Sequence, residues 1–416
     1  MISYNKAKKI LFNSKINIKN EIVLVGDSIN RISAKNIYSP SNYPSSNNTA
    51  FDGYAVNAED TYKLNKRKNK KFKILKTIAA GDNPKIINIK KYSTIQVMTG
   101  AIIPKPFNTI IPIEKINFYP NSFDPKYIII NSRIKKNNNL RFFGSDYKKG
   151  ELIIPAGEKI NSSHILAFKC LGVEKITVKK KPVIMFISTG NEISDKKIIP
   201  DWKIRNSNSY YINSLSKNLF FEYIDGGILR DKDENLLKKI IKKNFKTKCD
   251  IIITNGAISA GKYDFVPNVI KNFDLSNSFK GVAIRPGKPI MFAKFKKKNK
   301  SFFGLPGNPI SSAACFKFFV YPYLRFILNM KNEKSFIAKL KNSYTKKKNF
   351  TRFLKAKIST NKKAILEVEV LKGQESFRIK SLTKANTWGL FKKGKSYFKK
   401  GDLIECFKPL DPLDIE

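Results

Sequence analysis

The hydrophobic pattern beyond residue 182 constrains the fold of this chain more than any other feature. Short, continuously apolar runs recur there, and helical patterns at 208–223 and 233–245 lie between the first two of them. The apolar runs are PVIMFIST (182–189), CDIIIT (249–254), PIMFAKF (289–295) and SFFGL (301–305). Because a strand that is apolar throughout is buried on both faces, this alternation predicts a doubly wound, mainly parallel sheet between two layers of helices.

The rest of the chain predicts further domains, since 416 residues exceed one α/β domain. Residues 1–40 show an amphipathic helical pattern. Short β-branched runs from 51 to about 141 predict a small β domain. The segment 142–178 can pair with the N-terminal residues, which makes the β domain an insertion. Beyond residue 330, strand runs with glycine turns predict a small β-barrel or sandwich, so we expect a multidomain α/β protein.

The residue composition excludes several kinds of chemistry. His164 is the only histidine, which removes Ser-His-Asp triads and HExxH zinc sites, and the four cysteines form no C-x-x-C pair. Catalysis must therefore use carboxylates, lysine or arginine, hydroxyls, backbone amides or a hard metal ion. No apolar run is long enough to span a membrane and the first 25 residues lack a signal-peptide pattern, so we expect the cytosol.

The chain is strongly basic, with 80 Lys and Arg against 32 Asp and Glu, a net charge of +48. Such a charge is typical of nucleic-acid-binding proteins. Here, however, the basic residues are spread along the whole sequence, and no RRM, zinc-finger, homeodomain or KH signature accompanies them. We favour a general drift of composition, and we keep a basic nucleic-acid-binding or scaffold protein as an alternative.

Four glycine-containing turns follow the strands of the predicted sheet, where ligands of open α/β sheets bind. They are STGNE (188–192), TNGAISAGKYD (254–264), RPGKP (285–289) and LPGNP (305–309). In the last turn, Asn308 can cap the following helix, Pro309 suits its first position, and Gly307 lets an anion approach the free amides. Four such turns at one edge favour an anion-binding site over ordinary connections.

Acids and cations accompany these turns. Asp52 opens the β domain in DGYAV, and Thr99 follows a strand in MTGA. Together with Glu192 and Asp264, Asp52 provides the hard oxygen ligands that Mg²⁺ prefers. Thr99, Arg285 and Lys288 suit a phosphate or another oxyanion.

Eight sequence blocks, in this order, resemble the molybdopterin molybdenumtransferase family, which comprises bacterial MoeA and the E domain of gephyrin. They are DGYAV (52–56), MTGAIIP (98–104), GSD (144–146), LIIPAGEKI (152–160), ISTGNEI (187–193), TNGAISAGKYDFV (254–266), RPGKP (285–289) and LPGNPIS (305–311). The resemblance extends from about residue 45 to 320. The chain departs from the family pattern at three positions, Asn191, Ala257 and Glu375, the last of which replaces a usual glycine.

The resemblance implies an L-shaped homodimer and a division of each subunit into four domains. These are an elongated discontinuous domain (1–45 plus 142–178), an inserted β domain (46–141), a molybdopterin-binding α/β domain (179–329) and a C-terminal β-barrel (330–416). The reaction implied takes adenylylated molybdopterin and molybdate, forms molybdenum cofactor and releases AMP in a Mg²⁺-dependent step. Molybdopterin adenylyltransferase remains an alternative, because related adenylyltransferases share the α/β domain.

The resemblance also implies roles for individual residues. Asp52, Thr99, Glu192 and Asp264 would be catalytic, with Glu192 and Asp264 holding Mg²⁺ and with Asp52 and Thr99 contributed across the cleft by the other subunit. Substrate-binding positions would be Asp146, Ser259, Arg285, Lys288, Pro306, Gly307, Asn308, Pro309 and Ser381. The implied partners are adenylylated molybdopterin, molybdate and a second copy of the chain, with transient contacts to other cofactor-synthesis proteins and with no specific nucleic acid or membrane.

Overall fold

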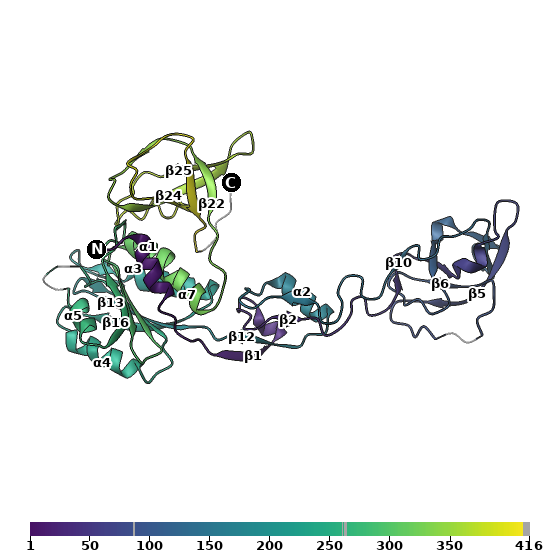
Figure 1. Cartoon of the computed structure of the whole chain (residues 1–416), viewed down its shortest axis with the longest axis horizontal. Helices are drawn as coiled ribbons and strands as arrows, with labels where there is room; N and C mark the ends of the chain where they lie inside the picture. The colour runs from purple at the N-terminus through teal and green to yellow at the C-terminus, as the bar shows by residue number, and fades with distance from the viewer. Residues whose placement is uncertain (86–87, 260, 262–263, 411–416) are drawn as a thin grey trace.

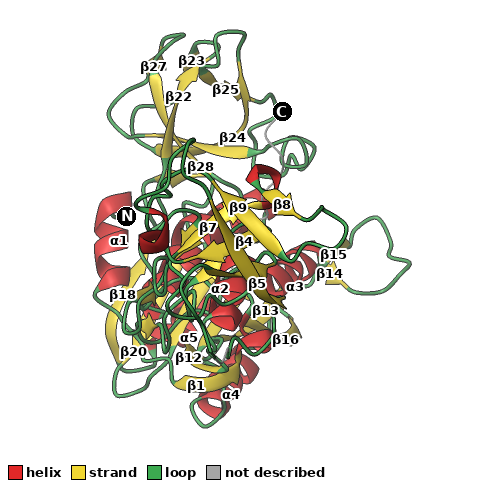
Figure 2. Ribbon diagram, turned by 90° about the vertical axis from the view of Figure 1, so that its right-hand side faces the viewer, coloured by secondary structure: helices red, strands yellow, loops and turns green. Residues whose placement is uncertain are grey.

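The computed structural model, which describes residues 1–85, 88–259, 261 and 264–410, shows an elongated molecule (Figure 1). The α/β domain and the C-terminal barrel form one end, the β domain forms the other, and a narrow arm joins them. Viewed along the arm, the barrel lies directly above the helix-covered α/β domain (Figure 2). Within the described residues, no helix is long and apolar enough to cross a membrane.

The α/β domain contains a six-stranded sheet in the order β16-β13-β17-β21-β20-β18. Its four parallel strands are β16 (Glu222–Leu229), β13 (Val183–Thr189), β17 (Ile251–Asn255) and β21 (Ser301–Leu305). The next strand, β20 (Met291–Phe295), is antiparallel to β21, and β18 (Leu275–Lys280) is antiparallel to β20. The predicted mainly parallel sheet is therefore confirmed.

Helices cover both faces of this sheet, because its strands alternate apolar side chains between two separate cores. The larger core, which includes Phe186, Ile253 and Phe303, packs against α1 (Tyr4–Phe12), α3 (Ser207–Asn218), α6 (Pro309–Cys315) and α7 (Tyr321–Ile327). A π-helical turn, Phe316–Val320, joins the last two helices. The smaller core, which includes Ile187 and Ile252, packs against α4 (Glu234–Asn244) and α5 (Val266–Lys271). This arrangement is doubly wound, as predicted.

The arm consists of segments from both sides of the β domain. In it, β1 (Asn20–Leu24) pairs with β12 (Lys175–Lys179), and β2 (Ile37–Tyr38) pairs with β11 (Leu152–Ile154). The arm also contains the 3₁₀ turn η1 (Val25–Ser28) and α2 (Ser162–Cys170). The single histidine, His164, forms a capping box with Asn161 at the start of α2, which is a structural role.

The N-terminal helical prediction is wrong beyond Phe12. Residues 16–19 alternate apolar and polar side chains, and Ile16 and Ile18 are buried, which fits an extended chain that continues into β1. The domain boundaries given above stay predictions. One assignment of a segment to a domain differs in the structure. The structure places α1 in the larger core of the α/β domain, since Ala7 and Leu11 are buried there, rather than in the arm.

The inserted β domain has a sheet in the order β7-β4-β6-β5-β9-β8. The strands are β7 (Thr109–Pro112), β4 (Gly53–Val56), β6 (Ser93–Val97), β5 (Lys70–Ile78), β9 (Tyr127–Ile130) and β8 (Asn117–Tyr119). The strand β3 (Asn48–Thr49) pairs with β10 (Leu140–Arg141), and the 3₁₀ turns are η2 (Ala58–Thr61) and η3 (Ile113–Lys115). Pairing of β3 with β10 closes the insertion where the chain enters and leaves it.

The C-terminal region forms a closed five-stranded barrel, because β26 (Thr387–Phe391) pairs with both β28 (Leu403–Phe407) and β24 (Thr351–Thr360). The other strands are β25 (Leu366–Val370) and β22 (Phe336–Leu340), and a side pair joins β23 (Tyr344–Thr345) to β27 (Tyr397–Phe398). From the α/β domain, β19 (Ile284–Arg285) pairs with β24, so the RPGKP turn lies against the barrel.

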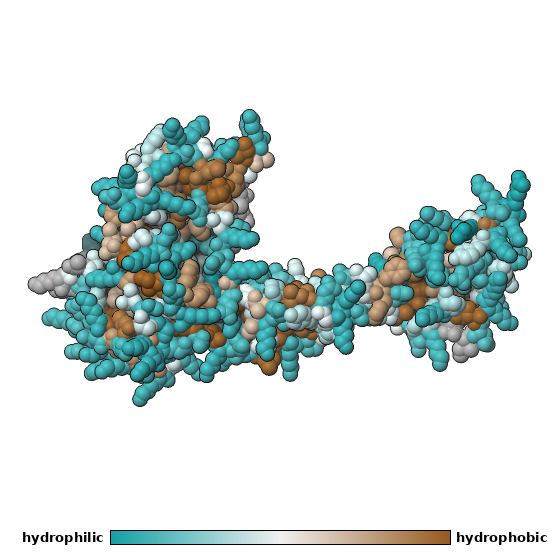
Figure 3. All heavy atoms as spheres, viewed as in Figure 1, coloured by the Kyte–Doolittle hydropathy of each residue, from teal (hydrophilic) through white to brown (hydrophobic). Residues whose placement is uncertain are grey.

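On the face shown in Figure 3, hydrophilic side chains occur on every part of the molecule, from the barrel to the β domain, with hydrophobic areas between them. They do not gather on one domain.

Candidate active site

A pocket of about 550 Å³ lies at the carboxyl ends of β13, β17 and β21. The turns that follow these three strands provide its walls, and the RPGKP turn reaches it through Pro289. The predicted site residues that line it are Glu192, Ser259, Asp264, Pro306, Gly307, Asn308 and Pro309. The structure therefore brings the four predicted turns to one edge of the sheet. Lys262 and Tyr263, which follow Gly261 in the second turn, lie outside the described residues.

Two buried asparagine amides hold the pocket walls together. Asn255 donates from its side chain to the Pro306 carbonyl (2.7 Å), and Asn208 donates to both the Asn255 side chain and the Gly307 carbonyl (2.7 Å each). Asn255 is 1% exposed. Sequence patterns did not single out either side chain, because their partners come from three separate segments. One signal was available, since a polar residue ends the otherwise apolar strand CDIIITN.

Replacing Asn255 with Ala should destabilise the α/β domain by about 2–3 kcal/mol, because the Pro306 carbonyl would lose its side-chain donor and the Asn208 amide would keep only the Gly307 carbonyl as an acceptor. Urea unfolding of purified protein measures this change. The matched control is Asn213→Ala, which removes an exposed asparagine from α3 and should change the free energy of unfolding little. Equal stability of the two variants would contradict the bracing role.

The two predicted metal ligands lie on opposite turns of the same pocket. Arg230 fixes the Glu192 turn by donating to the carbonyls of Gly190 (3.0 Å) and Ile193 (2.9 Å). At Gly190, φ is +143°, and a side chain there would collide with the Glu192 carboxylate. Asp264 accepts a hydrogen bond from the Gly261 amide (2.7 Å).

The donor set fits Mg²⁺ that is shared with a substrate. No group of three or more His, Cys, Asp or Glu side chains that could hold a metal occurs in the described part of the chain. Mg²⁺ does not need such a group, since proteins usually bind it through one or two carboxylates together with substrate phosphates and water. Glu192 and Asp264 supply these carboxylates in one pocket.

A second, cationic cleft adjoins this pocket. It has a volume of about 900 Å³, lies between the α/β domain and the barrel, and shares Pro289, Pro306 and Asn308 with the pocket. Its cations are Arg285, Lys288, Arg352 and Lys372. The Arg285 guanidinium lies 4.6 Å from the centre of the Phe350 ring, which orients it. Glu375 also lines the cleft, and Arg378, 3.6 Å away, balances its charge.

Two predicted details of this region differ in the structure. The Asn308 residue is the N-cap of α6, but its side chain makes no capping hydrogen bond. Ser381 is 7% exposed and donates to the carbonyls of Gly373 (2.7 Å) and Arg378 (3.3 Å), so its hydroxyl stabilises the loop, and Ser376 lines the cleft instead. Lys355 donates to the same two carbonyls, and burial lowers its pKa to about 8.

The remaining predicted site residues lie far from this pocket in the same chain. Asp52 precedes β4 and Thr99 follows β6, in the β domain at the opposite end of the molecule (Figure 1). Asp146 lies between β10 and β11, and its amide donates to the Tyr43 carbonyl (3.0 Å). One subunit cannot bring these three residues to Glu192. Only a second subunit could.

Asp52 and Thr99 nevertheless form a defined pair. The Asp52 carboxylate accepts hydrogen bonds from the Thr99 amide (2.6 Å) and hydroxyl (2.8 Å), and both bonds lower the pKa of Asp52 below its ordinary value. The stabilisation is present above the unfolded-state pKa of this carboxyl and is lost as the pH falls through its lower folded-state pKa. The carboxylate thus stays charged at neutral pH with one oxygen held in place.

Replacing Thr99 with Ala should raise the pKa of Asp52 toward its ordinary value, because the hydroxyl donor is lost. Thr99→Ser keeps the hydroxyl and should leave the pKa low. The ¹³C chemical shift of the Asp52 carboxyl, followed by NMR during a pH titration, measures both values. An unchanged pKa in the alanine variant would show that the backbone amide alone sets it.

Family models cover most of the chain. The MoeA N-terminal region (domain I and II) matches residues 2–172, a probable molybdopterin binding domain matches 185–325, and the MoeA C-terminal region (domain IV) matches 337–408. A solved molybdopterin biosynthesis MoeA protein from Pyrococcus horikoshii superimposes with a TM-score of 0.82 at 26% identity, covering 99% of this chain and 100% of that one. The resemblance inferred from the sequence blocks is therefore confirmed.

Relatives agree with these matches. A molybdopterin molybdenumtransferase of Staphylococcus epidermidis is 28% identical over 97% of this chain and 94% of its own length. Another, of Haemophilus influenzae, is 30% identical over 80% of each. With these matches, the fold and the pocket at the sheet edge define an enzyme of molybdenum cofactor biosynthesis. The chain belongs to the molybdopterin molybdenumtransferase family and is a transferase.

Proposed function

We propose that this enzyme inserts molybdate into adenylylated molybdopterin and releases AMP in a step that depends on Mg²⁺. The observation that carries the proposal is that two sites adjoin: a pocket lined by three carboxylates, Glu192, Asp231 and Asp264, lies next to a cleft lined by four cations. A nucleotide-linked phosphate and a metal oxyanion are both anions, so the pair of sites can hold both reactants side by side.

The residues of the pocket suit the cleavage of a phosphoanhydride, which depends mainly on positioning and on charge stabilisation. Glu192 and Asp264 would hold Mg²⁺, which when bound neutralises phosphate charge. Arg285 and Lys288 would hold the anionic groups in the cleft, and the turn from Pro306 to Pro309 would shape the oxyanion pocket. The amide bracket of Asn208 and Asn255 keeps this turn fixed.

The proposal includes a homodimer, because Asp52 and Thr99 reach a Glu192 pocket only from another subunit. A second subunit's β domain would close the pocket from the open side. We keep the cytosol as the compartment and adenylylated molybdopterin, molybdate and transient contacts with other cofactor-synthesis proteins as the partners.

The test is an AMP-release assay with purified protein, adenylylated molybdopterin, molybdate and Mg²⁺. We expect AMP to appear together with molybdenum cofactor, and we expect EDTA to stop its release until excess Mg²⁺ is added. Absence of AMP with the wild-type protein would contradict the proposal. A parallel reaction with ATP and bare molybdopterin tests the adenylyltransferase alternative, which predicts ATP consumption.

A further inference from the structure

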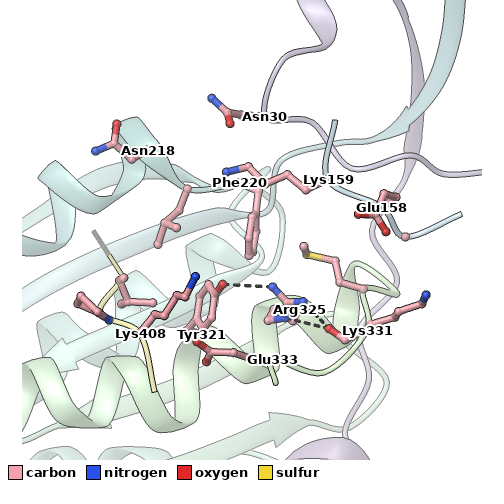
Figure 4. Close-up of a pocket in the computed structure, with 15 residues that line it drawn as sticks. Asn30, Glu158, Lys159, Asn218, Phe220, Tyr321, Arg325, Lys331, Glu333 and Lys408 are labelled. Atoms are coloured by element: carbon pink, nitrogen blue, oxygen red, sulfur yellow. Dashed lines mark hydrogen bonds between the residues drawn. The ribbon is translucent and has the colours of Figure 1, made fainter. Parts of the chain in front are cut away.

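A separate pocket lies where the arm, the α/β domain and the barrel meet (Figure 4). We call it the hinge pocket. It has a volume of about 610 Å³ and shares no lining residue with the pocket or the cleft described above. Its walls come from the arm loop Gly157–Lys159, from Phe220 and Tyr321 of the α/β domain, and from Lys408 at the end of the barrel.

Cations from all three parts converge on the hinge pocket. Lys159 extends over Phe220 and Lys408 extends toward Tyr321, whereas the Lys331 amine points away (Figure 4). In the described part of the chain, the ammonium groups of Lys159 and Lys408 have no hydrogen-bond or ion-pair partner. Arg325 is fixed between them, since it donates to the Tyr321 hydroxyl (3.2 Å) and to the Lys331 carbonyl (2.9 Å).

The carboxylates of the hinge pocket do not balance these cations. Glu333 is already paired with Lys317, which is 2% exposed, at 2.6 Å. Glu158 is the other acid in the lining. Among the described residues of the lining, Lys159, Lys408 and Arg325 therefore face one carboxylate that is not already paired. An anion in this space would gain charge-assisted hydrogen bonds from three domains at once.

The contact between the arm and the α/β domain at this place is narrow. The arm has its own hydrophobic core, and Ile32, together with Ile16 and Ile18 of the chain that leads into β1, joins the larger core of the α/β domain. Beside the hinge pocket, Gly157 lies so close to the Asn329 carbonyl that a side chain would collide with it, and its φ of +81° also favours glycine. A ligand held by Lys159 and Lys408 would bridge the two sides of this contact.

We propose that the hinge pocket binds a phosphate group, either free phosphate or the phosphate of a nucleotide, and thereby fixes the arm against the α/β domain and the barrel. The ammonium groups of Lys159 and Lys408 and the oriented guanidinium of Arg325 would recognise the phosphate beside two aromatic rings. Because the arm carries the β domain, occupancy of the hinge pocket sets the direction in which Asp52 and Thr99 are presented.

Binding is tested with radiolabelled inorganic phosphate in equilibrium dialysis at constant ionic strength. The full-length chain carries Arg285→Ala and Lys288→Ala, so that the active-site cleft does not contribute. We expect about one phosphate per chain, and a loss of affinity of about tenfold or more when Lys159→Ala and Lys408→Ala are added, since two charged hydrogen bonds disappear. The Lys159→Arg, Lys408→Arg variant should keep the binding.

A matched control separates this site from general attraction to a basic protein. Lys181 and Lys298 line a different pocket of similar size, about 550 Å³, so Lys181→Ala with Lys298→Ala removes the same charge elsewhere. Unchanged binding in this control supports the proposal. Equal losses in the two double variants, or no loss in either, would overturn it. If AMP displaces the labelled phosphate at a lower concentration than unlabelled phosphate does, the ligand is a nucleotide. If AMP competes more weakly than unlabelled phosphate, the ligand is free phosphate.

A distance measurement tests the effect on the arm. Cys170 is exposed on the arm and the other three cysteines are buried, so a spin label at Cys170 and a second at Lys239→Cys on α4 report the arm position. Labelled protein is mixed with excess unlabelled protein to isolate distances within one chain. Phosphate should narrow the distance distribution in the wild-type background and not in the Lys159→Ala, Lys408→Ala variant. An unchanged distribution in both would overturn the bridging role.

Discussion

Replacing Glu192 with Gln is expected to reduce the rate of AMP release by about 100-fold or more and to leave the free energy of unfolding unchanged. The substitution keeps the shape of the side chain and removes the charge that would hold Mg²⁺. Because Glu192 is exposed and its turn is fixed by Arg230 through backbone carbonyls, folding does not depend on the carboxylate. AMP quantified by chromatography in single-turnover reactions measures the loss.

Asp264→Asn should give a loss of similar size by the same reasoning. The asparagine oxygen can still accept the hydrogen bond from the Gly261 amide, so the turn is preserved while the charge is lost. In both variants, a higher Mg²⁺ concentration should recover part of the rate, which a purely structural defect would not show.

The matched control for these substitutions is Glu222→Gln. Glu222 is an exposed glutamate at the start of β16, at the opposite end of the same sheet, so this variant should retain full activity. Full activity in both Glu192→Gln and Asp264→Asn would show that these carboxylates do not hold the metal ion.

Much of the α/β domain could be predicted from the sequence, because strands buried on both faces leave continuous apolar runs that few other structures produce. Three of the four turns could be predicted as one site for the same reason, since parallel strands end at one edge. The RPGKP turn does not follow a strand of this sheet: it precedes β20, which is antiparallel and therefore begins at that edge. The strand β1 was missed. The alternation that leads into it, Ile16 and Ile18 with polar neighbours, is short, and it comes soon after a true helix, so the two periods merge in a sequence window.

The details of the site that were missed depend on contacts between distant segments. The amide of Asn208 finds the Gly307 carbonyl 99 residues away, and no local pattern indicates that partner. Ser381 and Ser376 are close in sequence and chemically identical, so only the fold of the loop shows which one faces the cleft. The separation of Asp52 from Glu192 within one chain agrees with the resemblance, which had implied that Asp52 comes from the other subunit, although no spacing in the sequence indicates it.

Mixed dimers should show that two subunits build each active site. Asp52→Asn and Glu192→Gln homodimers should each lose nearly all AMP release, whereas heterodimers purified through two different tags should recover about half of the wild-type activity. In such a heterodimer, one site combines both substitutions and the other combines the unchanged Asp52 of one subunit with the unchanged Glu192 of its partner. If each site came from a single chain, every site would carry one substitution and no activity would return.

Heterodimers of variants in the same domain provide the control for this recovery. When Asp52→Asn is combined with Thr99→Ala, both substitutions lie in the β domain, so each of the two sites carries one of them and their hydrogen-bonded pair is broken in both. We expect no gain over the better homodimer. Glu192→Gln combined with Asp264→Asn should likewise show no gain, because both residues line the same pocket. If AMP release recovers only when the two substitutions lie in different domains, the β domain of one subunit must act on the α/β pocket of the other.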